Sequence, residues 1–164
     1  MARDVDASMR DRVDRHYRRC EEVLRARDLD GFMDWLGADG TFPAADGTVV
    51  RIAGTRPFWA WRFANVLRVT SVELRIEDIS YDDDGLLVVD FHERGSMTVG
   101  GFDGLPVERA VDLHNRNLWE VSEDRFTARG GAELAAHRTI GGERLTDETD
   151  PWGFGAWERF KASG

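Results

Sequence analysis

The sequence contains 164 residues, which suits a single domain, because most domains span about 100–150 residues. Its 41% hydrophobic and 32% charged residues are typical of a soluble globular protein, and it has no apolar run of the roughly 20 residues that a membrane span needs. The net charge of −9 repels phosphate groups, so we expect neither nucleic acid nor a membrane as a partner.

The N-terminal segment and the cysteine content indicate the compartment. Residues 1–15, MARDVDASMRDRVDR, are charged from the start and lack the apolar region of a secretory signal. Cys20 is the single cysteine, which excludes an internal disulfide framework. We therefore expect a reducing, cytoplasmic location.

Two amphipathic helices are predicted within the first 36 residues. Apolar side chains recur at steps of three or four residues, which places them on one face of the first helix. This stripe consists of Met9, Val13, Tyr17, Cys20 and Leu24. Asp28 is a suitable N-cap for the second helix, and Gly37 stands where a C-terminal glycine is favoured.

A hairpin and a third helix follow. Two short extended segments in residues 41–52 flank Asp46 and Gly47, a pair that favours a tight turn. Thr55 is a candidate N-cap for the third helix, and Pro57 is tolerated in its first turn. The helix sequence FWAWRFANVL is apolar almost all round, which predicts burial on more than one side or a side that lines a cavity.

From residue 72 to about 135 the apolar residues alternate with period two, which predicts antiparallel strands. The expected strands span residues 72–81, 86–99, 107–121 and 126–134. The apolar parity slips near Glu77 and Asp78, which predicts a bulge that bends the sheet. Helices followed by a curved antiparallel sheet indicate an α+β domain with the helices on one face.

We expect a single domain over residues 1–135 and a C-terminal extension over 136–164. The tail WGFGAWERF is too aromatic to be freely solvated. Its apolar side chains are expected to pack on this domain or on a neighbouring subunit. They are Trp152, Phe154, Trp157 and Phe160.

The order of these elements resembles the nuclear transport factor 2-like superfamily. The resemblance covers residues 10–135 and rests on the segments DLDGFMDWLGADGTF, IAGTRPFWAW and NLWEVSEDRFTARG. Members include ketosteroid isomerases, limonene epoxide hydrolase, scytalone dehydratase and SnoaL-like polyketide cyclases, and residues 92–121 look most like the phenazine-biosynthesis A/B proteins. The resemblance implies a cone-shaped fold, in which three helices cover a pocket, and a homodimer.

The residues that carry catalysis in the ketosteroid isomerases are replaced in this chain. Their tyrosine donor on the first helix corresponds to Cys20, with Tyr17 one turn earlier on the same stripe. Their carboxylate base corresponds to Ala45, beside Asp46. The resemblance therefore implies the fold without that catalytic set.

The last strand differs in the same way. The carboxylate that serves the epoxide hydrolases and the phenazine proteins corresponds to Gly131, two residues before Glu133. Glu133 is therefore a lower-ranked candidate for the site.

The best candidates are polar residues on an apolar strand face. Asn115 and Asn117 share the parity of Leu113 and Trp119, and an unpartnered buried amide costs about 1–3 kcal/mol, so each amide needs a partner. Glu93 has the same parity as Phe91, so its carboxyl is expected to face the cone, where desolvation raises the pKa.

We assign Glu93 as general acid or base, and Asn115 and Asn117, with Tyr17, as further catalytic groups. The residues expected to bind substrate are Trp59, Trp61, Phe91, Trp119 and Asp46. In the alternative interpretation, Glu93 lies at the open rim in water and the amides bond each other or ordered water.

The histidines and the expected cofactors complete the site predictions. His92 and His114 share the even parity of Asp90 and Asp112, which favours the solvated or subunit-facing side of the sheet, so both rank lower as site residues. HER at 92–94 is not HExxH, and no pair of His or Cys residues has zinc-like spacing. We expect no metal and no cofactor.

These features favour a biosynthetic enzyme of the SnoaL-like or phenazine A/B-like kind. The expected reaction is a cofactor-free cyclisation, isomerisation or dehydration of a small carbonyl substrate. The alternatives are a ligand-binding protein without activity and a structural dimer-forming module on the same fold.

Overall fold

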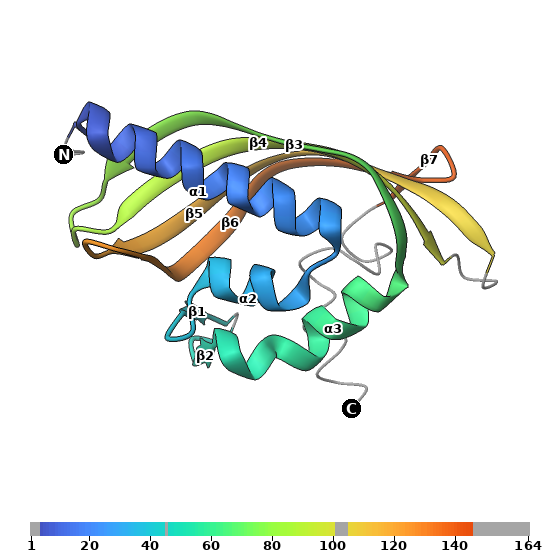
Figure 1. Cartoon of the computed structure of the whole chain (residues 1–164), viewed down its shortest axis with the longest axis horizontal. Coiled ribbons are helices and arrows are strands. Elements are labelled where there is room, and N and C mark those ends of the chain that lie inside the picture. The colour runs from blue at the N-terminus through green and yellow to red at the C-terminus, as the bar shows by residue number, and fades with distance from the viewer. Residues whose placement is uncertain (1–3, 45, 101–104, 146–164) are drawn as a thin grey trace.

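The computed structural model describes residues 4–44, 46–100 and 105–145, and its helices lie together on one side of a bent sheet (Figure 1). The predictions for Ala45, for the connection at 101–104 and for the aromatic tail at 152–160 lie outside the described residues. The helices are α1 (Ala7–Ala26), α2 (Leu29–Leu36), the 3-10 helix η1 (Ile52–Thr55) and α3 (Arg56–Asn65). The strands are β1 (Thr41–Pro43), β2 (Val49–Arg51), β3 (Val66–Tyr81), β4 (Leu87–Gly100), β5 (Pro106–Val121), β6 (Phe126–Ile140) and β7 (Glu143–Leu145).

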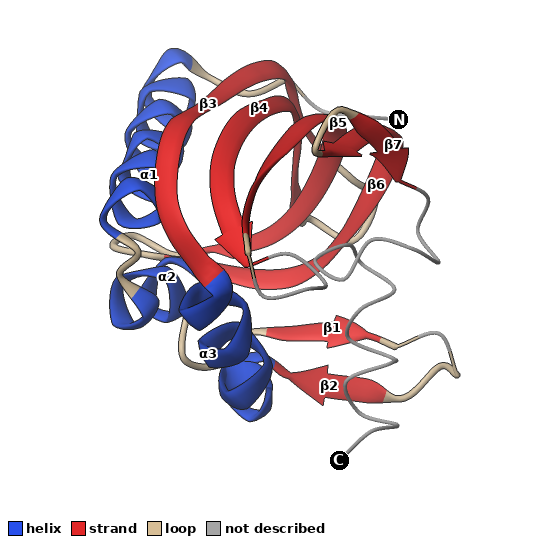
Figure 2. Cartoon of the chain, turned by 90° about the vertical axis from the view of Figure 1, so that its right-hand side faces the viewer, coloured by secondary structure: helices blue, strands red, loops and turns tan. Residues whose placement is uncertain are grey.

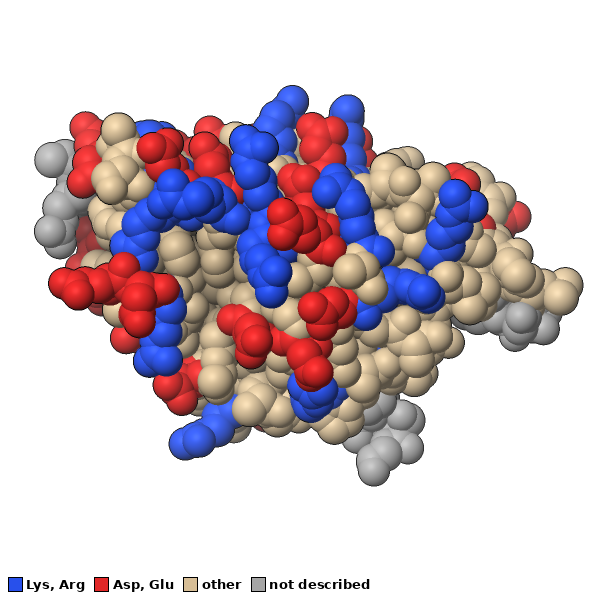
Figure 3. All heavy atoms as spheres, in the orientation of Figure 1, with Lys and Arg blue, Asp and Glu red and all other residues tan. Residues whose placement is uncertain are grey.

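Helix α1 has the predicted amphipathic character. The Asp6 carboxylate caps its N-terminus by accepting a hydrogen bond from the Met9 amide. The buried residues of α1 are Val13, Tyr17, Cys20 and Val23, which form one stripe against the sheet. Figure 3 shows basic and acidic side chains interspersed over the face of the molecule on which α1 lies.

Helix α2 begins and ends at the predicted residues. The Asp28 carboxylate accepts a hydrogen bond from the Gly31 amide. A Cβ at Gly31 would lie only 2.5 Å from Asp28 Oδ2, so a larger residue there would displace this cap. Gly37 ends the helix with a φ of 93°, a conformation that favours glycine. Trp35 Nε1 donates to the His16 carbonyl at 2.8 Å and thereby joins α2 to α1.

The described strands form a five-stranded antiparallel sheet in the order β3-β4-β5-β6-β7, and the β1–β2 hairpin is a separate pair. The register of β3 against β4 shifts between Ile76 and Asp78, which confirms the predicted bulge. Further shifts occur in β3 near Arg68 and between β5 and β6 at Asn115. The long strands are strongly curved, and the helices lie along one side of the sheet (Figure 2). The expected α+β fold is therefore confirmed.

Two strands are longer than the sequence predicts. Strand β3 begins at Val66, directly after α3, where it pairs with Val99 of β4. The Arg27 guanidinium donates to the carbonyls of Val66 and Leu67 at 3.0 Å. Strand β6 runs to Ile140, and positive φ angles at Gly141 and Gly142 turn the chain into β7. Residues 136–145 therefore continue the sheet instead of leaving it.

The core lies between α1, α2 and the concave sheet face and is rich in aromatic rings. The Tyr17 hydroxyl is 2.8 Å from Asn117 Nδ2 and 3.0 Å from Trp119 Nε1, and both nitrogens donate to it. His16 stacks on Trp35 and on Phe126, with ring centroids 5.0 and 4.3 Å away. Among the described helices, none combines the length and the apolarity needed to cross a bilayer.

Replacing Tyr17 with Phe should lower the free energy of unfolding by about 1–3 kcal/mol, because the buried N–H of Trp119 and the partly buried N–H of Asn117 lose their acceptor. Urea unfolding measures the change. The matched control is Tyr81→Phe at a half-exposed position, which should change stability by less than about 0.5 kcal/mol. Equal effects of the two substitutions would contradict this role of the Tyr17 hydroxyl.

Replacing His16 with Phe should make the protein more resistant to acid. Burial, helped by the nearby Arg12 charge, lowers the pKa of His16 from 6.5 to about 3. The unfolded chain therefore binds a proton that the folded chain rejects, and stability falls as the pH drops from 6.5 towards 3. His16→Phe keeps the ring stack and removes this loss, which amounts to about 2 kcal/mol at pH 5. Urea unfolding at pH 7.5 and pH 5 tests this, and an equal pH dependence of both proteins would refute it.

Candidate functional site

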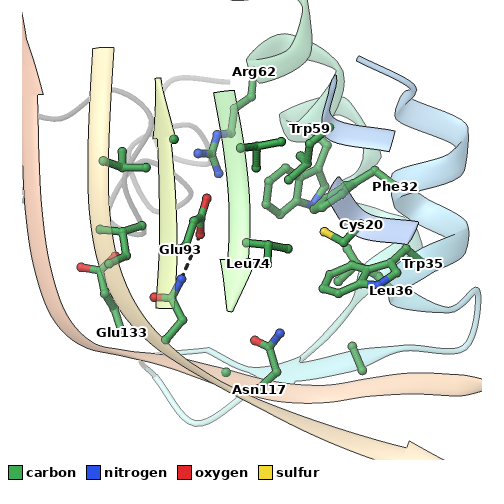
Figure 4. Close-up of a pocket in the computed structure, with 18 of the residues that line it drawn as sticks. Cys20, Phe32, Trp35, Leu36, Trp59, Arg62, Leu74, Glu93, Asn117 and Glu133 are labelled. Atoms are coloured by element: carbon green, nitrogen blue, oxygen red, sulfur yellow. Dashed lines mark hydrogen bonds between the residues drawn. The ribbon is translucent and has the colours of Figure 1, made fainter. Parts of the chain in front are cut away.

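A cavity of about 510 Å³ lies between the concave face of the sheet and the helices α2 and α3. Its wall is largely aromatic and aliphatic, and Figure 4 shows charged and amide side chains projecting into it from the sheet. Aromatic wall residues include Phe32, Trp35, Trp59, Phe63, Phe91 and Trp119. Such an enclosed apolar space with a few polar groups is typical of a small-molecule site.

Strand alternation brings the predicted polar residues to this cavity. Glu93 on β4 lines it, as do Asn115 and Asn117 on β5. Phe91 pairs with Asn115 and Glu93 with Leu113 in the β4–β5 register, so these side chains share one face. The odd-numbered residues 91–97 of β4 and 109–119 of β5 line the cavity, as the alternation predicts.

Glu93 lies in an environment that favours its neutral form. The side chain is half-buried, and its remaining surface faces the cavity rather than bulk water. Burial raises the pKa of Glu93, and the charge of Glu133 adds to this, while Arg109, Arg62 and the Asn115 hydrogen bond oppose it. Figure 4 shows Arg62 pointing toward the Glu93 carboxyl. A carboxyl with a raised pKa is suited to proton transfer near neutral pH.

Asn115 is bonded to Glu93 and has unused hydrogen-bonding capacity. Its Nδ2 donates to Glu93 Oε2 at 3.0 Å, and the residue is 7% exposed. Its Oδ1 is buried without a hydrogen-bond partner among the described residues. A buried carbonyl oxygen without a donor is costly, so this amide lowers the stability of the fold unless its oxygen gains a partner.

Asn117 has a different role from Asn115. Although it lines the cavity, its Nδ2 donates to the Tyr17 hydroxyl behind the wall. Tyr17 is 1% exposed and is not among the described cavity-lining residues, and burial raises its pKa. The structure therefore corrects the expected position of Tyr17: it supports the cavity wall and does not reach the cavity.

Two more expected cavity residues also lie elsewhere. The face of α3 that lines the cavity carries residues 58, 59, 62 and 63, which follow the helical period. Trp61 falls off this stripe and is 39% exposed. Asp46 lies in the exposed turn of the β1–β2 hairpin, where its carboxylate accepts hydrogen bonds from the Thr48 amide and hydroxyl. Trp59, Phe91 and Trp119 line the cavity as expected.

Acidic and basic side chains of β5 and β6 complete the site. Glu133, the lower-ranked candidate, lines the cavity and forms an ion pair with Arg138. Arg138 and Arg109 also line it and are 3% and 4% exposed. Sequence reasoning missed both arginines. The alternation of β5 could have placed Arg109 on the cavity face, but Arg138 lies beyond the predicted end of its strand.

The lower-ranked histidines lie on the outer face of the sheet. His92 and His114 face each other across β4 and β5, with Glu77 and Asp112 beside them. This placement agrees with their predicted parity. The sheet separates both imidazoles from the cavity.

Solved structures of other proteins share this architecture. A nuclear transport factor 2-like protein from Cytophaga hutchinsonii is similar with a TM-score of 0.53 and 13% identity, over 80% of this chain and 99% of that one. A conserved protein from Planctomyces limnophilus has a TM-score of 0.52 and 12% identity, over 74% of this chain and 94% of that one. A proposed aromatic ring hydroxylase from Novosphingobium aromaticivorans has a TM-score of 0.51 and 20% identity, over 90% of this chain and 100% of that one. Protein-family models and curated proteins give no match.

Replacing Glu93 with Gln should change how stability depends on pH. The pKa of Glu93 is higher in the folded chain than in the unfolded chain. As the pH rises above about 4.5, the unfolded chain therefore loses this proton first, and the free energy of unfolding decreases. The decrease ends once the pH has passed the pKa of Glu93 in the folded chain. Glu93→Gln removes this loss, so the variant should gain stability relative to wild type as the pH rises.

Urea unfolding from pH 4.5 to pH 8 measures the difference. Glu73→Gln, an exposed position on β3, is the matched control and should follow the wild type. A difference between Glu93→Gln and wild type that does not grow with pH would contradict the raised pKa.

Proposed function

We propose that this chain, which has the nuclear transport factor 2-like fold, is an enzyme that moves a proton on a small carbonyl compound. The observation that carries the proposal is the Glu93 carboxyl, which projects into an apolar cavity, has a raised pKa and is bonded to Asn115. The reaction class is cyclisation, isomerisation or dehydration of an aromatic or polyketide-like intermediate. The protein of similar fold from Novosphingobium aromaticivorans, a proposed aromatic ring hydroxylase, is compatible with an aromatic substrate.

Glu93 acts as the base in the proposed reaction. Its carboxylate takes a proton from the carbon next to the substrate carbonyl, so the C–H bond breaks, an O–H bond forms on Glu93, and the electron pair becomes an enolate. Burial makes the carboxylate a stronger base than in water, since it raises the pKa. The aromatic wall holds the substrate in place and excludes water.

The surrounding donors stabilise the negative charge as it moves. Before the transfer, Asn115 Nδ2 donates to the carboxylate, and the positive charges of Arg109 and Arg62 act on it. After the transfer Glu93 is neutral, and the same donors act on the enolate oxygen instead. In an isomerisation, the proton then returns from Glu93 to another carbon of the substrate. In a dehydration, Glu93 gives the proton to a hydroxyl group of the substrate, which leaves as water while the enolate electrons form a C=C bond.

Proton exchange on a model ketone tests the base. The full chain is incubated with β-tetralone in D₂O, and NMR follows the loss of the protons next to the carbonyl. Wild type should accelerate the exchange above the buffer rate, and Glu93→Gln should lower the accelerated rate at least about tenfold, because a positioned base contributes about 10²–10⁴-fold.

Two measurements accompany the exchange assay. Glu73→Gln, the exposed control, should retain the wild-type rate. Quenching of tryptophan fluorescence should show that Glu93→Gln still binds the ketone, because the apolar wall is intact. An unchanged exchange rate in Glu93→Gln would refute the assignment of Glu93 as the base.

A second candidate function is ligand binding without conversion. It is favoured by Gly131, which takes the place of the last-strand carboxylate that the resemblance implies. A Cβ at Gly131 would lie 3.3 Å from Asn117 Oδ1 and 3.2 Å from the Arg116 carbonyl, so a side chain there would require a small shift of β5. Binding of the ketone with exchange at the buffer rate would support this function over the enzyme.

A further inference from the structure

We propose that Glu77, His92 and His114 form a site for a divalent transition-metal ion such as Zn²⁺ on the outer face of the sheet. The three residues come from β3, β4 and β5, and one ligand atom from each lies within 4.8 Å of the others. His92 and His114 stand directly opposite each other in the register, with ring centroids 4.4 Å apart. Two imidazoles and one carboxylate are a donor set that Zn²⁺ favours, and three protein ligands leave a position for water.

The bulge in β3 explains why a carboxylate reaches the histidine pair. In the register, Ile76 pairs with Phe91 and Asp78 with Asp90, so Glu77 is the extra, unpaired residue. A bulge redirects a side chain. Here it brings Glu77 Oε2 to 3.2 Å from His114 Nδ1, on a strand that is not the neighbour of β3.

Asp112 orients the more buried imidazole. Its carboxylate contacts His92 Nε2, which leaves Nδ1 of the same ring on the side of β3, where Arg75 is 3.3 Å away. A carboxylate behind a histidine commonly fixes the ring and raises its basicity as a metal ligand. Nδ1 of His92, Nδ1 of His114 and Oε2 of Glu77 are therefore the three ligand atoms of the proposed site.

The cluster is accessible and can contract around an ion. The side chains of His114 and Glu77 are 43% and 34% exposed, so their rotation is not blocked by the core. Ligand atoms of a tetrahedral zinc ion lie about 3.3 Å apart, which follows from zinc bonds of about 2.0–2.1 Å. The distances of up to 4.8 Å would therefore close by roughly 1.5 Å at most through side-chain rotation.

Arg75 competes with the ion for the same position. One of its guanidinium nitrogens is 3.3 Å from both His92 Nδ1 and Glu77 Oε1. The Arg75 side chain is 63% exposed and is free to turn into water when an ion binds. Removing this positive charge should therefore tighten metal binding. A variant that misfolds would bind the ion more weakly, so tighter binding is evidence for the site itself.

The test is a titration of the full chain, without a polyhistidine tag, with CoCl₂ followed by visible absorption and with ZnCl₂ followed by calorimetry. We expect one ion per chain. His114→Ala and Glu77→Gln should each weaken binding at least about tenfold, since each removes one of three ligands, and Arg75→Ala should tighten it severalfold. His137→Ala removes an exposed histidine of β6 and is the matched control, with binding unchanged.

Three results would overturn the proposal: no uptake of either ion at millimolar concentration, the wild-type affinity in both His114→Ala and Glu77→Gln, or no tightening in Arg75→Ala. Circular dichroism confirms that each variant is folded. Because the sheet separates the cluster from the cavity, Glu93→Gln should bind the ion like the wild type. The metal proposal therefore succeeds or fails independently of the proposed enzyme.

Discussion

The alternation of side chains across one bent sheet is the constraint on which both candidate sites depend. A strand exposes successive residues to opposite faces, so β4 can present Phe91 and Glu93 to the cavity and His92 to the outside. Curvature makes the two faces unequal, because the concave face encloses a cavity that the helices cover. A carboxyl on the concave face is thus desolvated, while the His92 imidazole on the convex face has a carboxylate partner.

The sequence predicted much of this arrangement because its apolar residues recur with clear helical and strand periods. The stripe from Met9 to Leu24 gave α1, and the Asp28 and Gly37 caps gave the bounds of α2. The parity slip near Glu77 marked the bulge, and the odd-numbered apolar residues of β4 and β5 identified the face on which Glu93 and Asn115 line the cavity. Each of these signals is local, so a single sequence contains it.

The remainder depends on contacts between distant segments. The start of β3 pairs with Val99 of β4 and contacts Arg27, and both partners are far away in sequence and give no local signal. The shift in register between His114 and Asn115 changes which residues of β6 face inward, so the positions of Glu133 and Arg138 could not be derived from alternation alone. The cluster of Glu77, His92 and His114 was missed for a related reason, since its members are neighbours across three strands and have no metal-binding spacing along the chain.

The Glu93 carboxyl on the cavity wall has a consequence for selectivity. Apolar walls discriminate weakly between guests that differ by one small group, whereas a buried polar group that a guest must satisfy discriminates strongly. A compound of the right shape that offers no hydrogen-bonding group to Glu93 would leave this carboxyl desolvated. The cavity would then tell hydroxylated molecules from their deoxy analogues through one side chain, although most of its wall is apolar.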